Sequence, residues 1–203
     1  MRFDRAERWL HWTVGLLVLV MMATGAILYF GPLSGAIGRR ALMKDIHVWS
    51  GLLLSVPVVA ALAGRWRSGV LRDAGRVSRW TADDSLWVRS RGRSSSIRLG
   101  KFNPGQKVNS LFLAGILPVL LATGAIMKWF DPFPDSIRTG ATFVHDLAAF
   151  GVWIAVTGHI AKALSEPVAL RSMVSGWVPV DWARRHRPRW HRDVVGPDRD
   201  PDG

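Results

Sequence analysis

Cysteine is absent from the 203 residues of this sequence. Without thiolates the chain cannot form disulfides, ligate iron–sulfur clusters, attach haem covalently as c-type cytochromes do, or bind metals through sulfur. Any redox group held within these residues must therefore use other ligands.

Acidic residues and tyrosine are also scarce. There are 15 Asp and Glu against 27 Lys and Arg, which gives a net charge of +12, and one Tyr stands against 11 Trp. In a soluble nucleic-acid-binding domain the cations would be spread among the apolar residues, whereas here they are missing from whole stretches and crowded between them. Because Trp is enriched at bilayer interfaces, the composition predicts a membrane protein that does not bind nucleic acid.

Three uncharged stretches have about the 20 residues that span a bilayer core of roughly 30 Å, and a fourth, at 147–161, becomes long enough if it starts near Thr142 with His145 and Asp146 at the interface. They predict transmembrane helices at about 12–30, 46–64, 108–128 and 142–163. No Asp, Glu, Lys or Arg lies in the middle of these spans, which excludes the ionisable relay of a proton pump or ion-coupled transporter. The predicted fold class is an all-α integral membrane protein with a four-helix transmembrane bundle.

The loops between the spans differ in positive charge. The two termini and the 65–108 loop together hold 22 Lys and Arg, and the two short loops hold 5. The positive-inside rule therefore places both termini and the long loop in the cytoplasm. The positive-inside rule and attraction to anionic membrane lipid together account for the net positive charge without a nucleic-acid partner.

Residues 1–185 are predicted to form one transmembrane domain, followed by a basic and polar tail at 186–203 that we expect to be disordered. Within the long loop, Thr81–Asp84 resembles a capping box and predicts a short interfacial helix at about 82–89. His186 and His191 lie in the tail, where we expect solvent exposure.

Four histidines lie in or at the ends of the spans, and their levels sort them into two pairs. His47 and His145 are at the outer ends of the second and fourth spans, and His11 and His159 are at the inner ends of the first and fourth. His159 follows His145 by 14 residues, which returns to within about 40° of the same helix face.

Two level-matched imidazole pairs in an apolar bundle are what two b-type haems require, one pair for each iron. The iron of the outer haem would use His47 and His145, and that of the inner haem His11 and His159. Zinc is the main competing metal, but it usually takes three or four protein ligands. A histidine at a helix end can also be an interfacial anchor, and Asp146 can be a hydrogen-bond acceptor for His145 or a solvated carboxylate.

The sequence Ala-Thr-Gly-Ala-Ile occurs at 23–27 and again at 122–126. Together with the similar placement of His47 and His145, this repeat predicts two helical hairpins of one plan. Gly25 and Gly124 would let a helix or a flat ligand approach the backbone. For Gly25, room for a porphyrin and ordinary close helix packing are both open.

A polar turn precedes the third span and reads Gly-Lys-Phe-Asn-Pro-Gly-Gln-Lys at 100–107. Asn103 and Gln106 flank the turn at the level of His11 and His159. A solvated helix cap is one interpretation. The other is a quinone site, because a quinone headgroup needs hydrogen-bond partners, a proton source and a nearby electron donor.

These features resemble the gamma subunit, a di-haem cytochrome b, of respiratory formate dehydrogenases, within the wider bacterial b561-like and nickel–iron hydrogenase cytochrome b group. The turn is similar to the Gly-Lys-(Tyr/Phe)-Asn-x-Gly-Gln-Lys loop of that family, as are the Arg8–Trp12 opening and the His145/His159 spacing. The resemblance covers about residues 1–165. Pro104, in place of an expected Ala, and the tail depart from the pattern.

The resemblance implies a membrane anchor in the bacterial inner membrane with two haem b groups. An iron–sulfur subunit outside would deliver electrons from a molybdenum or tungsten catalytic subunit, and menaquinone or ubiquinone would be reduced at a pocket of Asn103, Gly105, Gln106 and His159. This chain would have no substrate-oxidising site of its own. The alternatives are a cytochrome b of a nickel–iron hydrogenase or thiosulfate reductase, a stand-alone b561-type cytochrome, and a haem-free scaffold.

Overall fold

The computed structural model describes residues 1–94 and 96–195, and every regular element in this part of the chain is an α-helix. The helices, in chain order, are α1 (Arg5–Tyr29), α2 (Gly31–Ile37), α3 (Arg40–Leu53), α4 (Ser55–Ala63), α5 (Arg67–Ser78), α6 (Ala82–Ser90), α7 (Pro104–Lys128), α8 (Asp135–Leu164), α9 (Pro167–Ser175), α10 (Val180–His186) and α11 (Pro188–Val195).

Within the described residues, four helical segments are long and apolar enough to cross a membrane. They are α1, α3 together with α4, α7 and α8, which confirms the predicted all-α membrane fold. The α8 helix has 30 residues, so at 1.5 Å per residue it extends about 45 Å and exceeds a bilayer core. All four segments begin upstream of the predicted spans, and capping boxes stand at the starts of α1 and α7.

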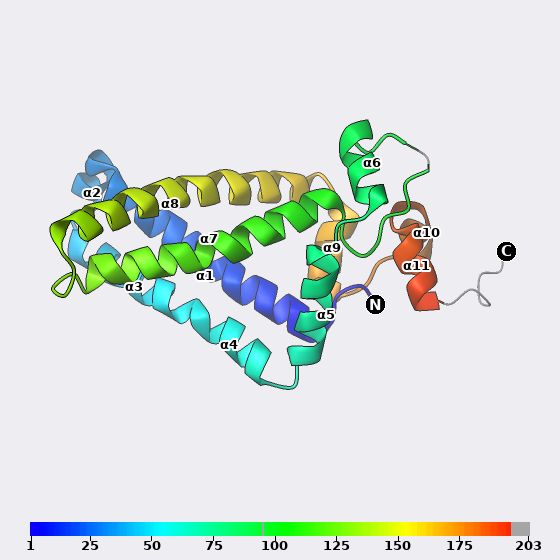
Figure 1. Ribbon diagram of the computed structural model, residues 1–203, viewed down its shortest axis with the longest axis horizontal. Helices are drawn as coiled ribbons and strands as arrows, with labels where there is room; N and C mark the ends of the chain where they lie inside the picture. Colours follow the sequence, from blue (N-terminus) through cyan, green and yellow to red (C-terminus); the bar gives the residue numbers. More distant parts are fainter. Residues whose placement is uncertain (95, 196–203) are drawn as a thin grey trace.

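The four segments form two antiparallel hairpins. Helix α1 packs along α3, and α7 packs along α8, as Figure 1 shows. One end of the bundle carries α2 and the short turn before α8; we call it the loop end. The other end carries α5, α6 and α9–α11 near the N-terminus, and we call it the terminal end (Figure 1).

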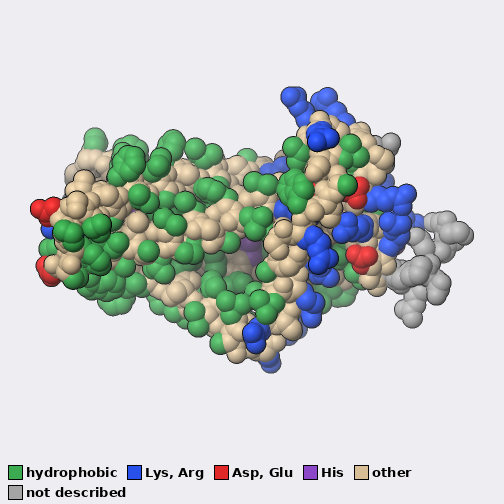
Figure 2. Space-filling view, in the orientation of Figure 1, with side chains coloured by type: hydrophobic (Ala, Val, Ile, Leu, Met, Phe, Trp, Pro, Cys, Tyr) green, Lys and Arg blue, Asp and Glu red, His purple; other side chains and the backbone are tan. Residues whose placement is uncertain are grey.

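Large apolar side chains remain exposed along the four long segments. Leu16, Val59, Phe143 and Phe150 are each at least 60% exposed, and Figure 2 shows hydrophobic side chains over the length of the bundle, with Lys and Arg gathered at the terminal end. A water-soluble monomer rarely exposes so much contiguous apolar surface. The lipid core of a membrane is the solvent that suits this surface.

Local rules explain where the long helices begin and break. Asp4 and Glu7 form a capping box at the start of α1, with the Asp4 carboxylate accepting the Glu7 N–H at 2.8 Å. The break between α3 and α4 lies just before Pro57, which has no N–H to continue the ladder. At the same break, the Ser55 hydroxyl donates a hydrogen bond to the Leu52 carbonyl at 2.7 Å.

The 65–108 segment is more ordered than the sequence predicted. The short helix expected at 82–89 is confirmed as α6, with Thr81 and Asp84 in a capping box. Helix α5, which was not predicted, precedes it. Both are tied to the bundle by buried lysines: Lys101 pairs with Glu7 and Asp73, and Lys107 pairs with Asp84 at 2.6 Å.

The tail also differs from the prediction. Residues 188–195 form α11 instead of a disordered chain, while 196–203 lie outside the described residues. Trp190 is 7% exposed and His191 is 5% exposed, so the expected solvation of His191 is wrong. A contact distant in the sequence ties α11 to the long loop: the Arg189 N–H donates to the Leu99 carbonyl at 3.2 Å.

Candidate functional site

The rings of His47 and His145 face each other at the loop end of the bundle. His47 comes from α3 in the first hairpin and His145 from α8 in the second. The ring centres are 6.3 Å apart, and the ring planes meet at 68°. The pair is therefore formed across the two hairpins.

Each of these two rings is held from within its own hairpin by a threonine. Thr24 Oγ1 lies 3.0 Å from His47 Nδ1, and Thr123 Oγ1 lies 3.0 Å from His145 Nδ1. Both threonines are buried, and each hydroxyl also reaches a carbonyl of its own helix at 2.8 Å, that of Val20 or Val119.

The glycine that follows each threonine makes room for the same ring. A Cβ built on Gly25 would lie 3.3 Å from His47 Cε1, and one on Gly124 would lie 3.3 Å from His145 Cε1. These distances are tighter than ordinary contacts, so a larger side chain would push the ring. The repeated Ala-Thr-Gly-Ala-Ile segment thus performs one task twice, and at Gly25 the space is taken by an imidazole of the neighbouring helix.

The rings of His11 and His159 face each other toward the terminal end. His11 lies on α1 and His159 on α8, and their ring centres are 5.9 Å apart with an interplanar angle of 61°. No hydrogen bond to either ring occurs in the described part of the chain. His159 is exposed and His11 half-buried. Figure 2 shows histidine atoms at the floor of a hollow in the apolar surface.

An apolar layer separates the two histidine pairs. Val18, Leu54, Val152 and Val156 form its buried centre, and partly buried side chains of α1 and α7 pack against it. In sequence this layer falls between His11 and Thr24 on α1 and between His145 and His159 on α8. The four histidines therefore lie at two levels, with hydrocarbon between them.

The two pairs suit a metal ion held in a planar macrocycle better than a bare metal ion. Metal–imidazole bonds of about 2 Å on opposite sides of one metal place the ring centres about 6 Å apart, close to both observed separations. Among the described residues, no group of three or more His, Cys, Asp or Glu is arranged to hold a metal. Each pair thus offers two protein ligands, and haem is the group whose own nitrogens supply the others.

The polar turn before α7 acts mainly as a helix cap. Asn103 Oδ1 accepts the Gln106 N–H at 2.8 Å, and Gln106 Oε1 accepts the Asn103 N–H at 3.0 Å. Two lysines of the same turn make the buried ion pairs described above. For Asp84, burial alone would raise the carboxyl pKa, but the hydrogen bonds from Lys107 and Thr81 outweigh it and lower the pKa below its usual value.

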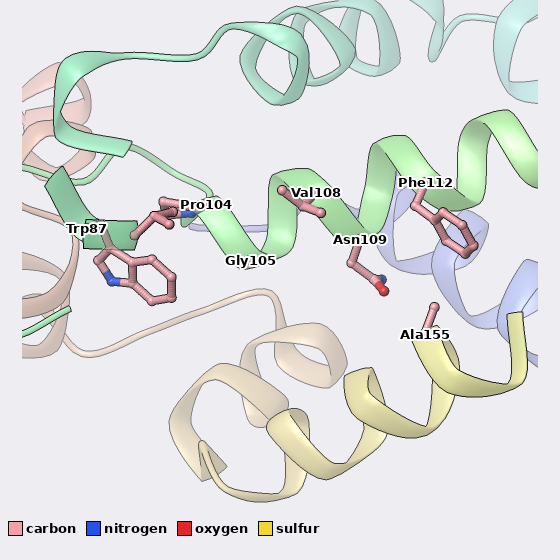
Figure 3. A pocket seen from close by; sticks show the side chains of 8 residues that line it. Trp87, Pro104, Gly105, Val108, Asn109, Phe112 and Ala155 are labelled. Carbon is pink, nitrogen blue, oxygen red and sulfur yellow. The ribbon is translucent and has the colours of Figure 1, made fainter. Parts of the chain in front are cut away.

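A cavity of about 330 Å³ lies beside this turn. It is lined from α6 by Trp87 and Val88, from α7 by Pro104, Gly105, Val108, Asn109 and Phe112, and from α8 by Ala155 (Figure 3). Gly105 is the one predicted quinone residue that lines it. Ala155 is one helical turn from His159, which places the cavity next to the His11–His159 level.

Asn109 is the functional candidate in this cavity that the sequence analysis missed. Its amide is half-buried, points from α7 toward α8 in Figure 3, and makes no hydrogen bond within residues 1–94 and 96–195. Thr24 and Thr123 were missed as well. Their signal was the repeat itself, in which a Thr precedes a His by 23 or 22 residues in both hairpins.

Comparison with known proteins places the chain in a family. The family model for prokaryotic cytochrome b561 matches residues 2–176. The cytochrome b556 subunit of formate dehydrogenase from Haemophilus influenzae is 28% identical over 191 residues, covering 91% of this chain and 79% of the relative.

Two relatives in Escherichia coli K12 are similar. The cytochrome b556(fdo) subunit of formate dehydrogenase is 26% identical over 205 residues, covering 95% of this chain and 92% of the relative. The cytochrome b556(Fdn) subunit of the nitrate-inducible formate dehydrogenase is 24% identical over 201 residues, covering 93% and 88%. With four membrane-length helices and a family match over most of its length, this chain belongs to the prokaryotic cytochrome b561 family, whose members bind haem b.

Proposed function

We propose that this chain is the di-haem membrane anchor of a formate dehydrogenase-like respiratory oxidoreductase and that it connects a partner enzyme to membrane quinone. The observation that carries the proposal is the pair of facing imidazoles at each of two levels, 6.3 Å and 5.9 Å apart, with an apolar layer between them. The relatives named as formate dehydrogenase subunits, which align along most of this chain, favour that type of complex.

His47 and His145 would hold one haem b, and His11 and His159 the other. Bound haem supplies a one-electron carrier at each level of the membrane. The chain's own contribution is to place the imidazoles, to surround them with hydrocarbon, and to keep mid-membrane charges away from them. A metal held by three or four protein side chains would need ligands that these two levels do not bring together.

The distribution of positive charge supports an orientation with the terminal end in the cytoplasm and the loop end outside, in the inner membrane of a bacterium. An iron–sulfur partner would then bind near His47 and His145. The catalytic subunit, with molybdenum or tungsten, would follow it in the same complex.

The cavity beside α7 is the best candidate for the quinone headgroup, either menaquinone or ubiquinone. Its lining is almost wholly apolar, as a quinone ring requires, and it lies next to the His159 level. Asn109 offers an unused amide there. The Asn103 and Gln106 oxygens are engaged in the helix cap, which leaves the side-chain amide N–H groups of these residues to donate to a quinone carbonyl, and Gly105 would let the ring approach the backbone.

The test is haem quantitation and a reduced-minus-oxidised spectrum of the purified full-length chain, alongside His145→Ala and His159→Ala. We expect two non-covalent b haems per wild-type chain and one in each variant, with a different spectral component lost in each. His186→Ala, which alters an exposed histidine of α10, is the matched control and should keep both haems. Wild-type protein from haem-replete membranes that is colourless would refute the proposal, and two haems retained in His159→Ala would refute the pairing.

A further inference from the structure

The histidine pair at the loop end has a feature that the proposed function does not use: a threonine hydroxyl lies against each imidazole ring. In both hairpins a buried threonine lies 3.0 Å from the Nδ1 atom of the ring. The repeat occurs once on α1 and once on α7. The same threonine–histidine contact is therefore formed independently at each ring of the His47–His145 pair.

The direction of these hydrogen bonds follows from the bonds that the hydroxyls already make. A threonine hydroxyl has one hydrogen and two lone pairs. The Thr24 hydrogen is directed to the Val20 carbonyl at 2.8 Å, and the Thr123 hydrogen to the Val119 carbonyl at 2.8 Å. Each oxygen is then left as an acceptor, so the imidazole Nδ1 must be the donor.

A proton on Nδ1 leaves Nε2 unprotonated, and that nitrogen is then the metal ligand. The hydrogen bond also restricts rotation of the ring, and Gly25 or Gly124 gives the ring its place against the neighbouring helix. A hydrogen bond to the second nitrogen of a ligating imidazole makes the ring a stronger donor to its metal. Stronger donation stabilises the oxidised state of the iron.

We propose that Thr24 and Thr123 are positioning residues for the haem at the loop end, where they fix His47 and His145 as Nε2 ligands and lower the reduction potential of that haem relative to the one at the terminal end. The inference rests on the proposed di-haem function. It assigns a chemical role to the Ala-Thr-Gly-Ala-Ile repeat. It also gives the two haem sites different ligand environments, because only the His47 and His145 rings have a threonine hydroxyl on Nδ1.

The alternative is that the threonines only satisfy carbonyls of their own helices, as Thr commonly does. In that case their loss would change stability without changing the electronic state of the haem. The two roles are separated by measuring a property of the haem itself.

The experiment is a redox titration of the purified full-length chain, monitored in the visible spectrum, for wild type, Thr24→Val, Thr123→Val and the double variant. Val keeps the branched shape but removes the hydroxyl. We expect the haem that disappears in His145→Ala to shift to a more positive potential in each single variant. The shift should be larger in the double variant than in either single variant, because each hydroxyl acts on a different ligand of the same haem. The haem that disappears in His159→Ala should keep its potential.

Two controls accompany the titration. Thr24→Ser and Thr123→Ser retain the hydroxyl and should restore the wild-type potential. Thr142→Val removes the hydroxyl of a threonine on α8 that bonds only to its own helix, at the Arg138 carbonyl, and should shift neither potential. The electron paramagnetic resonance spectrum of the oxidised protein should change in the Val variants, because it depends on how the two rings are oriented.

The outcomes distinguish this inference from the proposed function. Wild-type protein with two haems and unchanged potentials in the double Val variant would overturn the inference and leave the di-haem function intact. Shifts that Ser does not reverse would overturn it too. A wild type that lacks the haem assigned to His47 and His145 would overturn both.

Discussion

The two histidine pairs of this bundle have similar ring separations but different surroundings. At the loop end, each ring has a threonine on Nδ1 and a glycine against its Cε1. At the terminal end, the described residues provide no hydrogen bond to either ring, and His159 is exposed. The spacing is therefore similar but the anchoring is unequal: hydrogen bonds restrain the two rings at the loop end, and the His159 ring at the terminal end lies at the surface of the protein.

The largest expected effect tests the space behind the anchored rings. Gly124→Leu places a long side chain where even a Cβ would be 3.3 Å from the His145 ring, so we expect the variant to lose one of two haems. Gly115→Leu on the same helix has nothing within 4 Å and should retain both. Haem per chain is the measurement, and full occupancy in Gly124→Leu would contradict the tight fit.

The next effect concerns the buried ion pair that belongs to the terminal end. Lys107→Met leaves the buried Asp84 carboxylate without its cation, which we expect to destabilise the packing of α6 by about 3–5 kcal/mol. Hydrogen exchange in α6 measures this opening. Lys162→Met, which breaks the exposed pair with Glu166, should cost no more than about 1 kcal/mol at its own site. Equal protection of α6 in Lys107→Met and wild type would show that the pair is dispensable.

A smaller effect is expected at the cavity. Asn109→Leu removes the side-chain amide that lines the cavity, and the loss of about 1–1.5 kcal/mol corresponds to roughly 5- to 13-fold weaker quinone binding. Both haems should remain. Ser110→Ala, a neighbouring exposed position on α7, is the matched control. Unchanged affinity for a soluble quinone analogue, measured by quenching of its fluorescence or by titration calorimetry, would remove Asn109 from the site.

The smallest effect is a pH dependence confined to the terminal end. The pKa of Asp84 is lowered in the folded protein, so its stabilising contribution is present above the unfolded value of about 3.9 and is lost as pH falls through the folded value. Opening of α6, followed by limited proteolysis with an acid-stable protease, should therefore increase below about pH 4. Asp84→Asn should flatten this dependence. The Asp135–Arg138 pair at the loop end is exposed and should add little.

The long helices were predictable because a membrane imposes a simple requirement. Each span needs enough uncharged residues to cross the hydrocarbon, and a helix hydrogen-bonds its own backbone N–H and C=O groups. Length and composition are therefore enough to identify a span. The helix at 82–90 was equally local, since Thr81 and Asp84 form its capping box within four residues. The tail was not predictable in this way, because α11 is tied to a distant part of the chain: the Arg189 N–H donates to the Leu99 carbonyl, and Trp190 and His191 are buried.

The candidate site shows the same division between local and distant contacts. Helical periodicity placed His145 and His159 on one face and suggested both pairs. In the polar turn, Asn103 and Gln106 cap α7 through their side-chain oxygens and their role as quinone partners stays a prediction, while Asn109, inside an apolar stretch, lines the cavity. A sequence pattern does not reveal whether an amide is already used by its own backbone.

The sequence by itself determined that this is a basic, cysteine-free, four-span membrane protein with histidines at two levels, because charge, length and helical rise are properties of each segment alone. The tertiary structure decided that the His47 and His145 rings meet across two hairpins, that Thr24 and Thr123 fall on their Nδ1 atoms, and that Lys107 meets Asp84. These contacts depend on how separate helices rotate and approach one another. That arrangement is set by packing of the whole bundle and cannot be derived from any one helix.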